Sequence, residues 1–443
     1  MSVMDLSARA LAAEVRAGRV TPAQVAEAAL ARVADRNPAL NALTLTNPHL
    51  QAEAAEVAVR LARGDALPLA GVPVVIKDNI WVKGLRITQG SHLFAEFVAP
   101  EDARAVALLR QAGALILGIG TCSEFACKGA THTPLYGITR NPSDLSRTPG
   151  GSSGGCVAAV AAGMAPLALG TDAGGSSRRP PAHTGLVGLK PSQDLVPYGP
   201  GFDEPVAGIS VIAPIARDVA DVRLAMAVLA GVPDVAPQVT ALAVSRDFGL
   251  GQRLDPDMAR AYDRSLAALQ RAGYELTEAA PDWQGLDGAS VMPLQFAGLA
   301  RLFGAEWQRD PGRFDPDLGA QITLGLSLSP QQVTQARQAS ARMAEILGAF
   351  LDRHPLWLTP TTPCAAWPVG QLAPATIAGL PCGPRDHAAF TSQANHAGCP
   401  ALSLPCGTTT DGLPLGMQLW AARGRDAALL AAADRLAPLL TRL

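Results

Sequence analysis

The hydrophobic positions near the start of the chain follow helical periodicity. Residues 5–36 place apolar side chains at helical spacing in two stretches, and Thr21 and Pro22 suit the N-cap and first turn of the second one. We expect this helix to end at Asn37-Pro38 and to be followed by a strand at 41–45 and a third amphipathic helix at 50–63. The pattern predicts that this region is a helical scaffold rather than part of a functional site.

Further along, short apolar runs rich in β-branched residues replace the helical pattern. They predict buried strands at 72–76 and 114–119, with an amphipathic helix at 102–113 between them. This strand–helix–strand order favours a largely parallel sheet with helices on both faces. The same reasoning predicts helices at 156–163, 217–231, 255–273 and 426–440, strands at 165–169, 239–244 and 356–363, and a helix-rich segment at 286–351.

Composition narrows the class of protein. The chain has 443 residues, of which 48% are hydrophobic, and this is enough apolar material for a large core. Its net charge of −2 and its lack of a basic tract argue against nucleic-acid binding. No apolar run reaches the length of a membrane span, and the N-terminus lacks the apolar centre of a signal peptide. We therefore expect a cytoplasmic location, without a membrane partner.

The seven cysteines do not form a recognisable framework. Their number is odd, they are scattered, and none belongs to a C-x-x-C pair. The seven histidines also stand apart from one another. This pattern argues against a disulfide framework and against a zinc site, and it favours ordinary buried thiols.

Two glycine-rich turns that carry serine are the main chemical signal. They lie at 150–155 (GGSSGG) and 170–176 (GTDAGGS), and the small-residue helix and short strand predicted above join them. Glycine allows the backbone to approach a ligand closely and to adopt positive φ. Two hydroxyls on such turns, joined by a rigid core segment, indicate a reaction site.

Lys77 follows the apolar run at 72–76, where that strand should end. A lysine in this position is usually solvated, but the apolar run before it and Asp78-Asn79 after it favour an inward side chain. A lysine can act as a base only when it is neutral, and burial lowers its pKa from the reference of about 10.4. Enclosure by the serine turns would supply that burial.

These motifs together resemble the amidase signature family of serine hydrolases. The resemblance rests on both serine turns, the arginine and proline that follow the second turn, GLVGLKP at 185–191, GVPVVIKDN at 71–79 and Glu124-Phe125-Ala126, and it extends to Gln418. It implies a Ser-Ser-Lys triad in which one serine follows a cis peptide bond. By this resemblance Lys77 is the base, Ser152 the bridging serine and Ser176 the nucleophile.

The resemblance also implies a fold: one α/β/α unit around a large, twisted, mixed β-sheet. We expect a single domain over 1–443, with further strands at 206–216, 390–407 and 413–419. Its parts would be an N-terminal helical scaffold at 1–65, a catalytic core at 66–235, a variable helical segment at 286–351 that helps line the substrate entrance, and C-terminal strands with a closing helix at 355–443.

The implied activity is hydrolysis of a small carboxylic amide to an acid and ammonia or an amine. No metal or cofactor is expected, and a homodimer is compatible with the family. The backbone N–H groups of Ala173, Gly174, Gly175 and Ser176 would hold the oxyanion. The remaining assignments are supporting roles for Ser153, Asp172 and Arg178, and substrate-binding roles for Arg179, Tyr136 and Cys127.

Arg179 is an additional arginine, three positions after Ser176. A guanidinium binds carboxylates well, so Arg179 could pair with an acidic substrate. The alternative is a structural or solvated arginine.

Three other functions stay open. Residues 150–154 match the G-x-S-x-G elbow, which would make Ser152 the nucleophile of a Ser-His-Asp hydrolase, with His183 as the one histidine placed near a serine turn. The preceding polar, proline-bearing loop argues against an elbow, which should follow a strand.

A phosphate-binding loop is the second alternative, but neither glycine-rich turn is followed by the Gly-Lys-Ser/Thr that such a loop carries. A glutaminase-type A subunit of a tRNA-dependent amidotransferase would keep the fold, but QDLVPY at 193–198 departs from such subunits.

Overall fold

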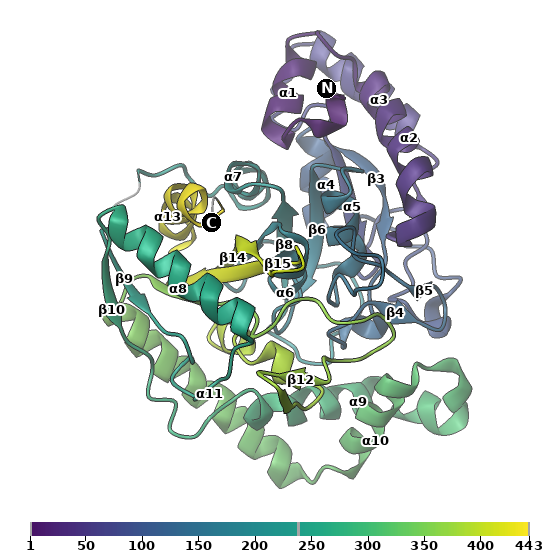
Figure 1. Cartoon of the computed structure of the whole chain (residues 1–443). Coiled ribbons are helices and arrows are strands. Elements are labelled where there is room, and N and C mark those ends of the chain that lie inside the picture. The colour runs from purple at the N-terminus through teal and green to yellow at the C-terminus, as the bar shows by residue number, and fades with distance from the viewer. Residues whose placement is uncertain (1, 237–239, 442–443) are drawn as a thin grey trace.

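The computed structural model describes residues 2–236 and 240–441. One 11-stranded sheet crosses this part of the chain, and helices cover both of its faces (Figure 1). Its strands, in spatial order, are β1 (Leu43–Thr46), β3 (Leu115–Gly120), β2 (Pro73–Lys77), β6 (Leu167–Asp172), β8 (Val211–Ala216), β7 (Val187–Lys190), β14 (Ala401–Thr408), β15 (Pro414–Trp420), β11 (Trp357–Pro360), β9 (Ala241–Val244) and β10 (Glu275–Glu278).

The α-helices are α1 (Ala8–Arg16), α2 (Pro22–Leu40), α3 (Leu50–Ala62), α4 (Arg104–Gln111), α5 (Gly154–Ala161), α6 (Arg179–Thr184), α7 (Val219–Ala230), α8 (Pro256–Arg271), α9 (Met292–Arg309), α10 (Pro316–Ser327), α11 (Pro330–Arg353), α12 (Ser392–His396) and α13 (Asp426–Leu440). Two small hairpins pair β4 (His132–Thr133) with β5 (Gly137–Ile138) and β12 (Thr376–Ile377) with β13 (Leu380–Pro381). None of the described helices is both long enough and apolar enough to span a bilayer.

The sheet is mixed, as the family resemblance implied, and the expectation of a largely parallel sheet was wrong. Four of its strand pairings are parallel, and six are antiparallel. The strand–helix–strand order holds for β2 and β3, which α4 joins. By contrast, β14 and β15 form a hairpin, and a connection of a few residues permits only antiparallel pairing.

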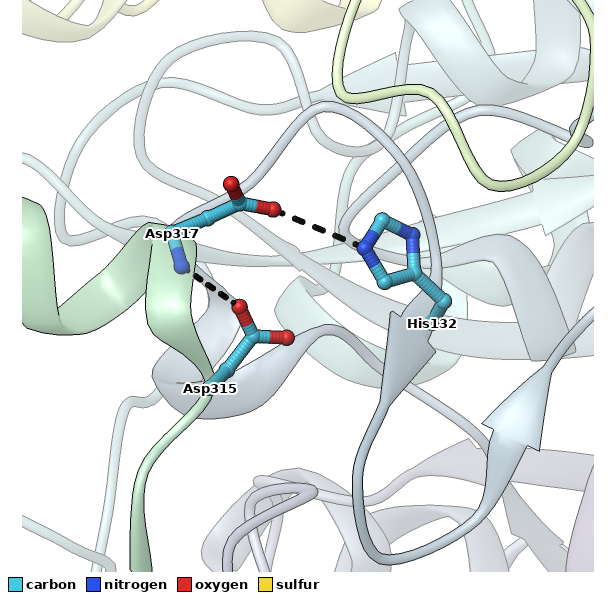
Figure 2. Close-up of side chains that lie close together, drawn as sticks. All are labelled: His132, Asp315 and Asp317. Carbon is cyan, nitrogen blue, oxygen red and sulfur yellow. Dashed lines mark hydrogen bonds and ion pairs between the residues drawn. The ribbon is translucent and has the colours of Figure 1, made fainter. Parts of the chain in front are cut away.

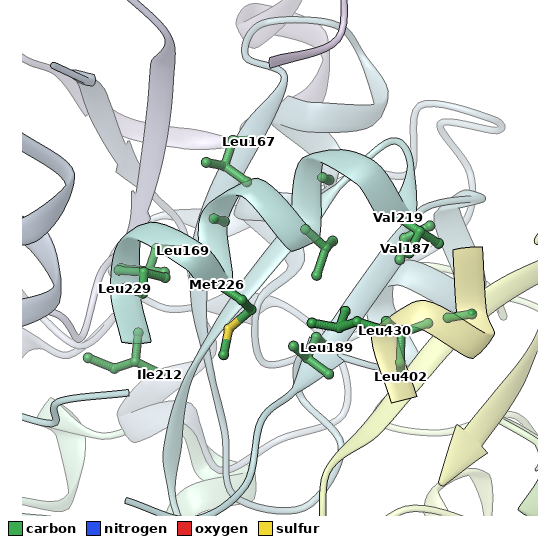
Figure 3. Close-up of a cluster of buried hydrophobic side chains, with 14 of the residues drawn as sticks. Leu167, Leu169, Val187, Leu189, Ile212, Val219, Met226, Leu229, Leu402 and Leu430 are labelled. Carbon is green, nitrogen blue, oxygen red and sulfur yellow. The ribbon is translucent and has the colours of Figure 1, made fainter. Parts of the chain in front are cut away.

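Period-2 alternation along the central strands divides the core between the two faces. On one face, Leu167 and Leu169 of β6 and Leu189 of β7 pack beneath α7 and α13, as Figure 3 shows. Ala168 of β6 points to the other face, into the cluster that includes α2, α3 and α5. Truncation of a buried leucine here should cost about 2–5 kcal/mol, because a fully packed site leaves a cavity behind.

The second helix is longer than the sequence predicted. It does not end at Asn37-Pro38 but continues to Leu40, and Asn41 caps it in a left-handed conformation with φ of 50°. Pro38 lies in the last turn, where its missing N–H removes a single helical hydrogen bond. The helix therefore ends where Asn41 can adopt positive φ.

Other predicted boundaries differ by a few residues. The segment expected to be strand from 390 contains the short helix α12, and β14 begins only at Ala401. The strand expected at 239–244 is β9, although Val239 lies outside the described residues. The variable segment at 286–351 is helical, and its helices α9 and α10 lie side by side at one end of the molecule (Figure 1).

Candidate active site

A cavity of about 640 Å³ contains both serines of the glycine-rich turns. Ser152 and Ser176 line it, together with Thr171 and Asn79 from the ends of the central strands. The opposite wall comes from distant parts of the chain: 198–210, the start of α9, the junction of α10 and α11, and 383–396. The two serine turns and the ends of β2 and β6 thus supply the hydroxyls, and the second half of the chain supplies much of the enclosure.

Lys77 is the last residue of β2, an interior strand between β3 and β6. Its side chain is completely buried, and its Nζ lies 2.8 Å from Ser152 Oγ and 2.8 Å from Thr171 Oγ1. Burial lowers the pKa of Lys77 because the ammonium form loses its hydration. The geometry favours a neutral amine next to a serine hydroxyl, the arrangement a base requires.

Ser152 follows a cis peptide bond from Gly151, as the family resemblance implied. Glycine is required at position 151 because a Cβ there would come within 2.8 Å of the carbonyl oxygen of Lys128. The next residue, Ser153, is buried, and its hydroxyl lies 3.4 Å from the carbonyl oxygen of Thr171. The turn therefore packs against the backbone on two sides.

The turn that carries Ser176 is held by the buried carboxylate of Asp172. This carboxylate accepts hydrogen bonds from the backbone N–H groups of Gly174 (3.1 Å), Gly175 (2.6 Å) and Ser177 (3.1 Å). Gly175 has φ of 113°, a conformation that favours glycine. Ser176 is only 7% exposed but lines the cavity, so its hydroxyl is reachable from the substrate side alone.

The four N–H groups predicted for an oxyanion hole are not equivalent. Those of Gly174 and Gly175 donate to Asp172, whereas those of Ala173 and Ser176 have no acceptor within the described chain. Ala173 and Ser176 both line the cavity. The oxyanion hole stays a prediction, and its two free donors are the ones at Ala173 and Ser176.

Arg178 neutralises Asp172 from behind the turn. Its Nε and Nη2 lie 3.0 and 3.1 Å from the two carboxylate oxygens, and neither side chain is exposed. Burial alone would raise the pKa of Asp172, but the guanidinium of Arg178 outweighs it and holds that pKa well below its usual range. Asn395 adds a 2.8 Å contact to Nη2 of Arg178. The ion pair fixes the shape of the turn that carries Ser176.

The nucleophile-elbow alternative lacks its base in this geometry. Both ring nitrogens of His183 are buried without a hydrogen-bond partner among the residues that the structure describes, and the ring packs edge-on against Trp367 at 5.4 Å. Burial, followed by the charge of Arg179, lowers the pKa of His183 to about 3. Ser152 instead contacts Lys77, so the geometry favours a lysine-based system.

The three predicted substrate-binding residues differ in position. Arg179 and Cys127 line the cavity, and Cys127 is a buried thiol whose pKa burial raises to about 12. Tyr136 is not among the lining residues, because it lies in the turn of the β4–β5 hairpin, where its carbonyl accepts a 2.6 Å hydrogen bond from Asn41. The structure does not bring Tyr136 to the cavity.

Sequence reasoning missed several residues of the site. Thr171 had a usable signal, because it follows glycine in a strand that pairs with the strand of Lys77. Asn395, Thr391 and Arg385 had none. Asn395 and Thr391 reach the second serine turn, and Arg385 reaches Cys127, each from more than 200 positions further along the chain.

A separate polar cluster could be mistaken for a metal site. Figure 2 shows His132, Asp315 and Asp317, whose potential ligand atoms lie within 4.8 Å of one another. The ammonium of Lys128, which the figure does not draw, lies 2.5 Å from Asp315 and 2.9 Å from His132. We interpret the cluster as an ion-pair network centred on Lys128.

Comparisons with known proteins identify the family. The model of the family described as Amidase matches residues 24–430. The A subunit of glutamyl-tRNA(Gln) amidotransferase from Symbiobacterium thermophilum is 34% identical, over 94% of this chain and 92% of that protein. An acylamidase from Rhodococcus erythropolis is also 34% identical, over 96% and 93%. A crystal structure of an amidase superposes with a TM-score of 0.90 at 30% identity and covers 98% of this chain and 100% of the other.

Proposed function

The chain belongs to the amidase signature family, and we propose that it hydrolyses a small carboxylic amide to an acid and ammonia or an amine through an acyl-enzyme on Ser176. The observation that carries the proposal is the 2.8 Å contact between the buried amine of Lys77 and the hydroxyl of Ser152. A serine needs a partner that accepts its proton, and this amine supplies one without a histidine.

The first half of the reaction acylates the enzyme. Ser176 Oγ attacks the amide carbon and passes its proton to Ser152 Oγ, while Ser152 passes its own proton to Lys77 Nζ. The tetrahedral oxyanion receives hydrogen bonds from the backbone N–H groups of the turn at 173–176, those of Ala173 and Ser176 being free. Lys77 then returns a proton through Ser152 to the leaving nitrogen, and the C–N bond breaks.

The second half regenerates the enzyme. Water attacks the ester of Ser176, and the same hydroxyl chain takes its proton to Lys77. The ester C–O bond then breaks, Ser176 regains a proton, and the acid leaves. No metal or cofactor takes part in this scheme.

The lining of the cavity supports an organic substrate of modest size. Its apolar side chains include Phe125, Phe202 and Phe296, and about 640 Å³ is ample for a small amide. Arg179 also lines the cavity, and the interpretation that it contacts a substrate carboxylate stays a prediction.

We further propose that the enzyme acts in the cytoplasm and needs no nucleic acid, membrane or metal. A homodimer is testable by light scattering.

The second candidate function is that of a glutaminase-type A subunit, which a relative with 34% identity favours. Such a subunit would release ammonia from glutamine for a partner. Purified alone, it should prefer glutamine to simple amides, and a partner should stimulate it. A stand-alone amidase should turn over simple amides at full rate without a partner.

A hydrolysis screen tests the proposal directly. The purified full-length protein is incubated with aryl, alkyl and acidic amides and with glutamine, beside Ser176→Ala. Release of ammonia that survives Ser176→Ala would remove Ser176 as the nucleophile. A fluorophosphonate adduct, located by mass spectrometry, should lie on Ser176; an adduct on Ser152 would favour the elbow mechanism.

A further inference from the structure

Two arginines, Arg179 and Arg385, line the cavity that holds the serines, and neither forms an ion pair with a carboxylate among the described residues. Arg178, by contrast, is fully paired with Asp172 just behind the turn. A desolvated cation without a counter-charge is costly, and two close together repel each other. Their presence in one cavity therefore calls for an anion that the protein itself does not supply.

Arg179 uses most of its donors within the protein. Its Nη1 donates to the carbonyl oxygen of Gly174 and to Thr391 Oγ1 at 3.1 Å, and its Nη2 lies 3.4 Å from the carbonyl oxygen of Gly151. Its Nε is buried and has no acceptor in the described part of the chain. Gly151 precedes Ser152, and Gly174 lies two positions before Ser176, so Arg179 connects the two serine turns. It contributes positive charge to the cavity but has little room to bind a ligand.

Arg385 has donors left over. It lies beyond β13, and its Nη2 donates to the carbonyl oxygen of Cys127 at 2.9 Å and to Gln321 Oε1 at 3.1 Å. These two bonds fix the guanidinium. The N–H groups on Nε and Nη1 have no acceptor within the described chain, and neither atom is sealed from the cavity as Nε of Arg179 is. The side chain is thus oriented in advance, with N–H groups unused.

Burial disfavours the charged form of both arginines. Burial lowers the pKa of Arg179 to about 9; the carboxylate of Asp172 opposes this shift, and the charges of Arg385 and Arg178 add to it. Burial also lowers the pKa of Arg385. A pKa of about 9 keeps Arg179 charged at neutral pH, and a nearby anion would stabilise the charged form of both arginines.

Four acidic residues also line the cavity, Asp203, Glu204, Asp287 and Asp386, and none of them forms an ion pair with Arg179 or Arg385. Asp287 accepts a hydrogen bond from the backbone of Ser290, and Asp386 accepts one from the backbone of Gly383. Glu204 accepts from the hydroxyl of Tyr198, and Lys77, not Arg385, is the cation whose field acts on it. These carboxylates therefore leave Arg385 without an ionic partner among the described residues.

We propose that Arg385 anchors a carboxylate of the substrate, so that the enzyme prefers amides that also carry an acid group. The inference rests on the proposed amide hydrolysis at Ser176 and names the substrate class of that site. It assigns direct contact with the acid group to Arg385, whereas Arg179 holds the turns and adds positive potential.

The test compares matched substrates that differ only in charge. Succinamate, glutaramate and adipamate are each measured beside the uncharged alkyl amide of the same chain length, with wild type, Arg385→Gln and Arg385→Lys. For the best acidic amide, Arg385→Gln should lower kcat/KM about 10–100-fold, mainly through KM, because a charged hydrogen bond is lost. The neutral amide should lose far less, and Arg385→Lys should recover part of the loss. Arg337→Gln, on the exposed face of α11, is the matched control.

Equal losses for acidic and neutral amides, or a wild-type preference for the neutral amide, would overturn the inference while leaving amide hydrolysis intact. Binding of glutarate to wild type and Arg385→Gln, measured by calorimetry, separates the two proposals. If no amide is hydrolysed but glutarate binds only to wild type, the proposed function fails and the anion site stands. If amides are hydrolysed and glutarate binds both proteins equally or neither, the anion site fails.

Discussion

The side-chain oxygen of Thr171 lies 2.8 Å from the amine of Lys77, the same distance as the hydroxyl of Ser152. Thr171 also receives a 3.0 Å hydrogen bond from the side-chain amide of Asn79. A neutral amine has two N–H groups and one lone pair. If one N–H points to Thr171, the lone pair is free to face Ser152, so Thr171 orients the base.

This relationship makes Thr171 a positioning residue with a measurable effect. Thr171→Val removes the acceptor but keeps the shape, and we expect kcat to fall about 10–100-fold with little change in KM, because a misplaced catalytic group loses its reactive geometry. Thr171→Ser should restore most of the rate. A purely structural role would instead lower the melting temperature and affect both variants alike.

The activity should rise with pH because Lys77 acts in its neutral form. Burial lowers the pKa of Lys77, so the neutral fraction grows as the pH increases through that lowered value. We expect kcat/KM to show one rising limb that ends well below the usual pKa of lysine. Lys77→Met should lower kcat about 10²–10⁴-fold and remove this limb.

A second group could produce a similar limb, and a variant separates the two. Glu204 lines the same cavity, and burial raises its pKa to about 7. Glu204→Gln should leave the rising limb in place if Lys77 causes it. Loss of the limb in Glu204→Gln would assign it to the carboxyl group and contradict the role of Lys77.

The ion pair behind the nucleophile should matter for stability as well as rate. Asp172→Asn leaves the guanidinium of Arg178 buried without its counter-charge, and we expect a loss of about 3–5 kcal/mol in the free energy of unfolding. Urea denaturation at pH 7 measures it. Asp263→Asn, which breaks an exposed pair with Arg246, is the control and should change stability by less than about 1 kcal/mol.

The pH dependence of this loss has a definite sign. The pKa of Asp172 is lower in the folded protein than in the unfolded chain, so its stabilising effect is complete above the unfolded value of about 3.9. The effect is lost as the pH falls towards the lower, folded value. The gap between wild type and Asp172→Asn should therefore be constant near neutrality and shrink in acid; a gap that grows in acid would contradict the ion pair.

Much of the fold could be predicted because the sequence signals are local. Neighbouring residues alone specify β2, through the apolar run before Lys77, and they specify α3 and α13, through apolar side chains at helical spacing. The mixed order of the sheet came from the family resemblance, since no local pattern places β8 between β6 and β7. Pairing partners depend on long-range packing, which a single sequence does not display.

The candidate site, like the fold, could be predicted only where the sequence signal is local. Its reactive side chains lie on motifs with an evident local pattern, whereas the walls of the cavity do not. Arg385 has no motif around it, and only the folded chain brings it to Cys127. Conversely, Tyr136 follows a suggestive loop, yet the β4–β5 hairpin keeps it away from the cavity.

The network around Lys128 provides a last prediction, because it joins the cavity wall to the variable helices. Lys128 is completely buried, and Asp315, its 2.5 Å partner, caps the start of α10 and donates its own N–H to Glu124 at 2.7 Å. Lys128→Met leaves Asp315 buried without a counter-charge and should cost about 3–5 kcal/mol. Cys127, the neighbour of Lys128 in the chain, lines the cavity. Loss of the network should therefore disturb substrate binding, and we expect KM to rise more than kcat falls.

A chelator applied to the wild type distinguishes an ion-pair network from a metal centre. If Lys128 holds the carboxylates together, a chelator should leave wild-type activity and melting temperature unchanged, because the ammonium already occupies the position that a cation would take. For the stability of Lys128→Met, the control is Glu306→Gln, which breaks an exposed pair with Arg309 and should change the free energy of unfolding little. A chelator that inactivates wild type, with recovery on adding Zn²⁺ or Mg²⁺, would instead assign His132, Asp315 and Asp317 to a metal.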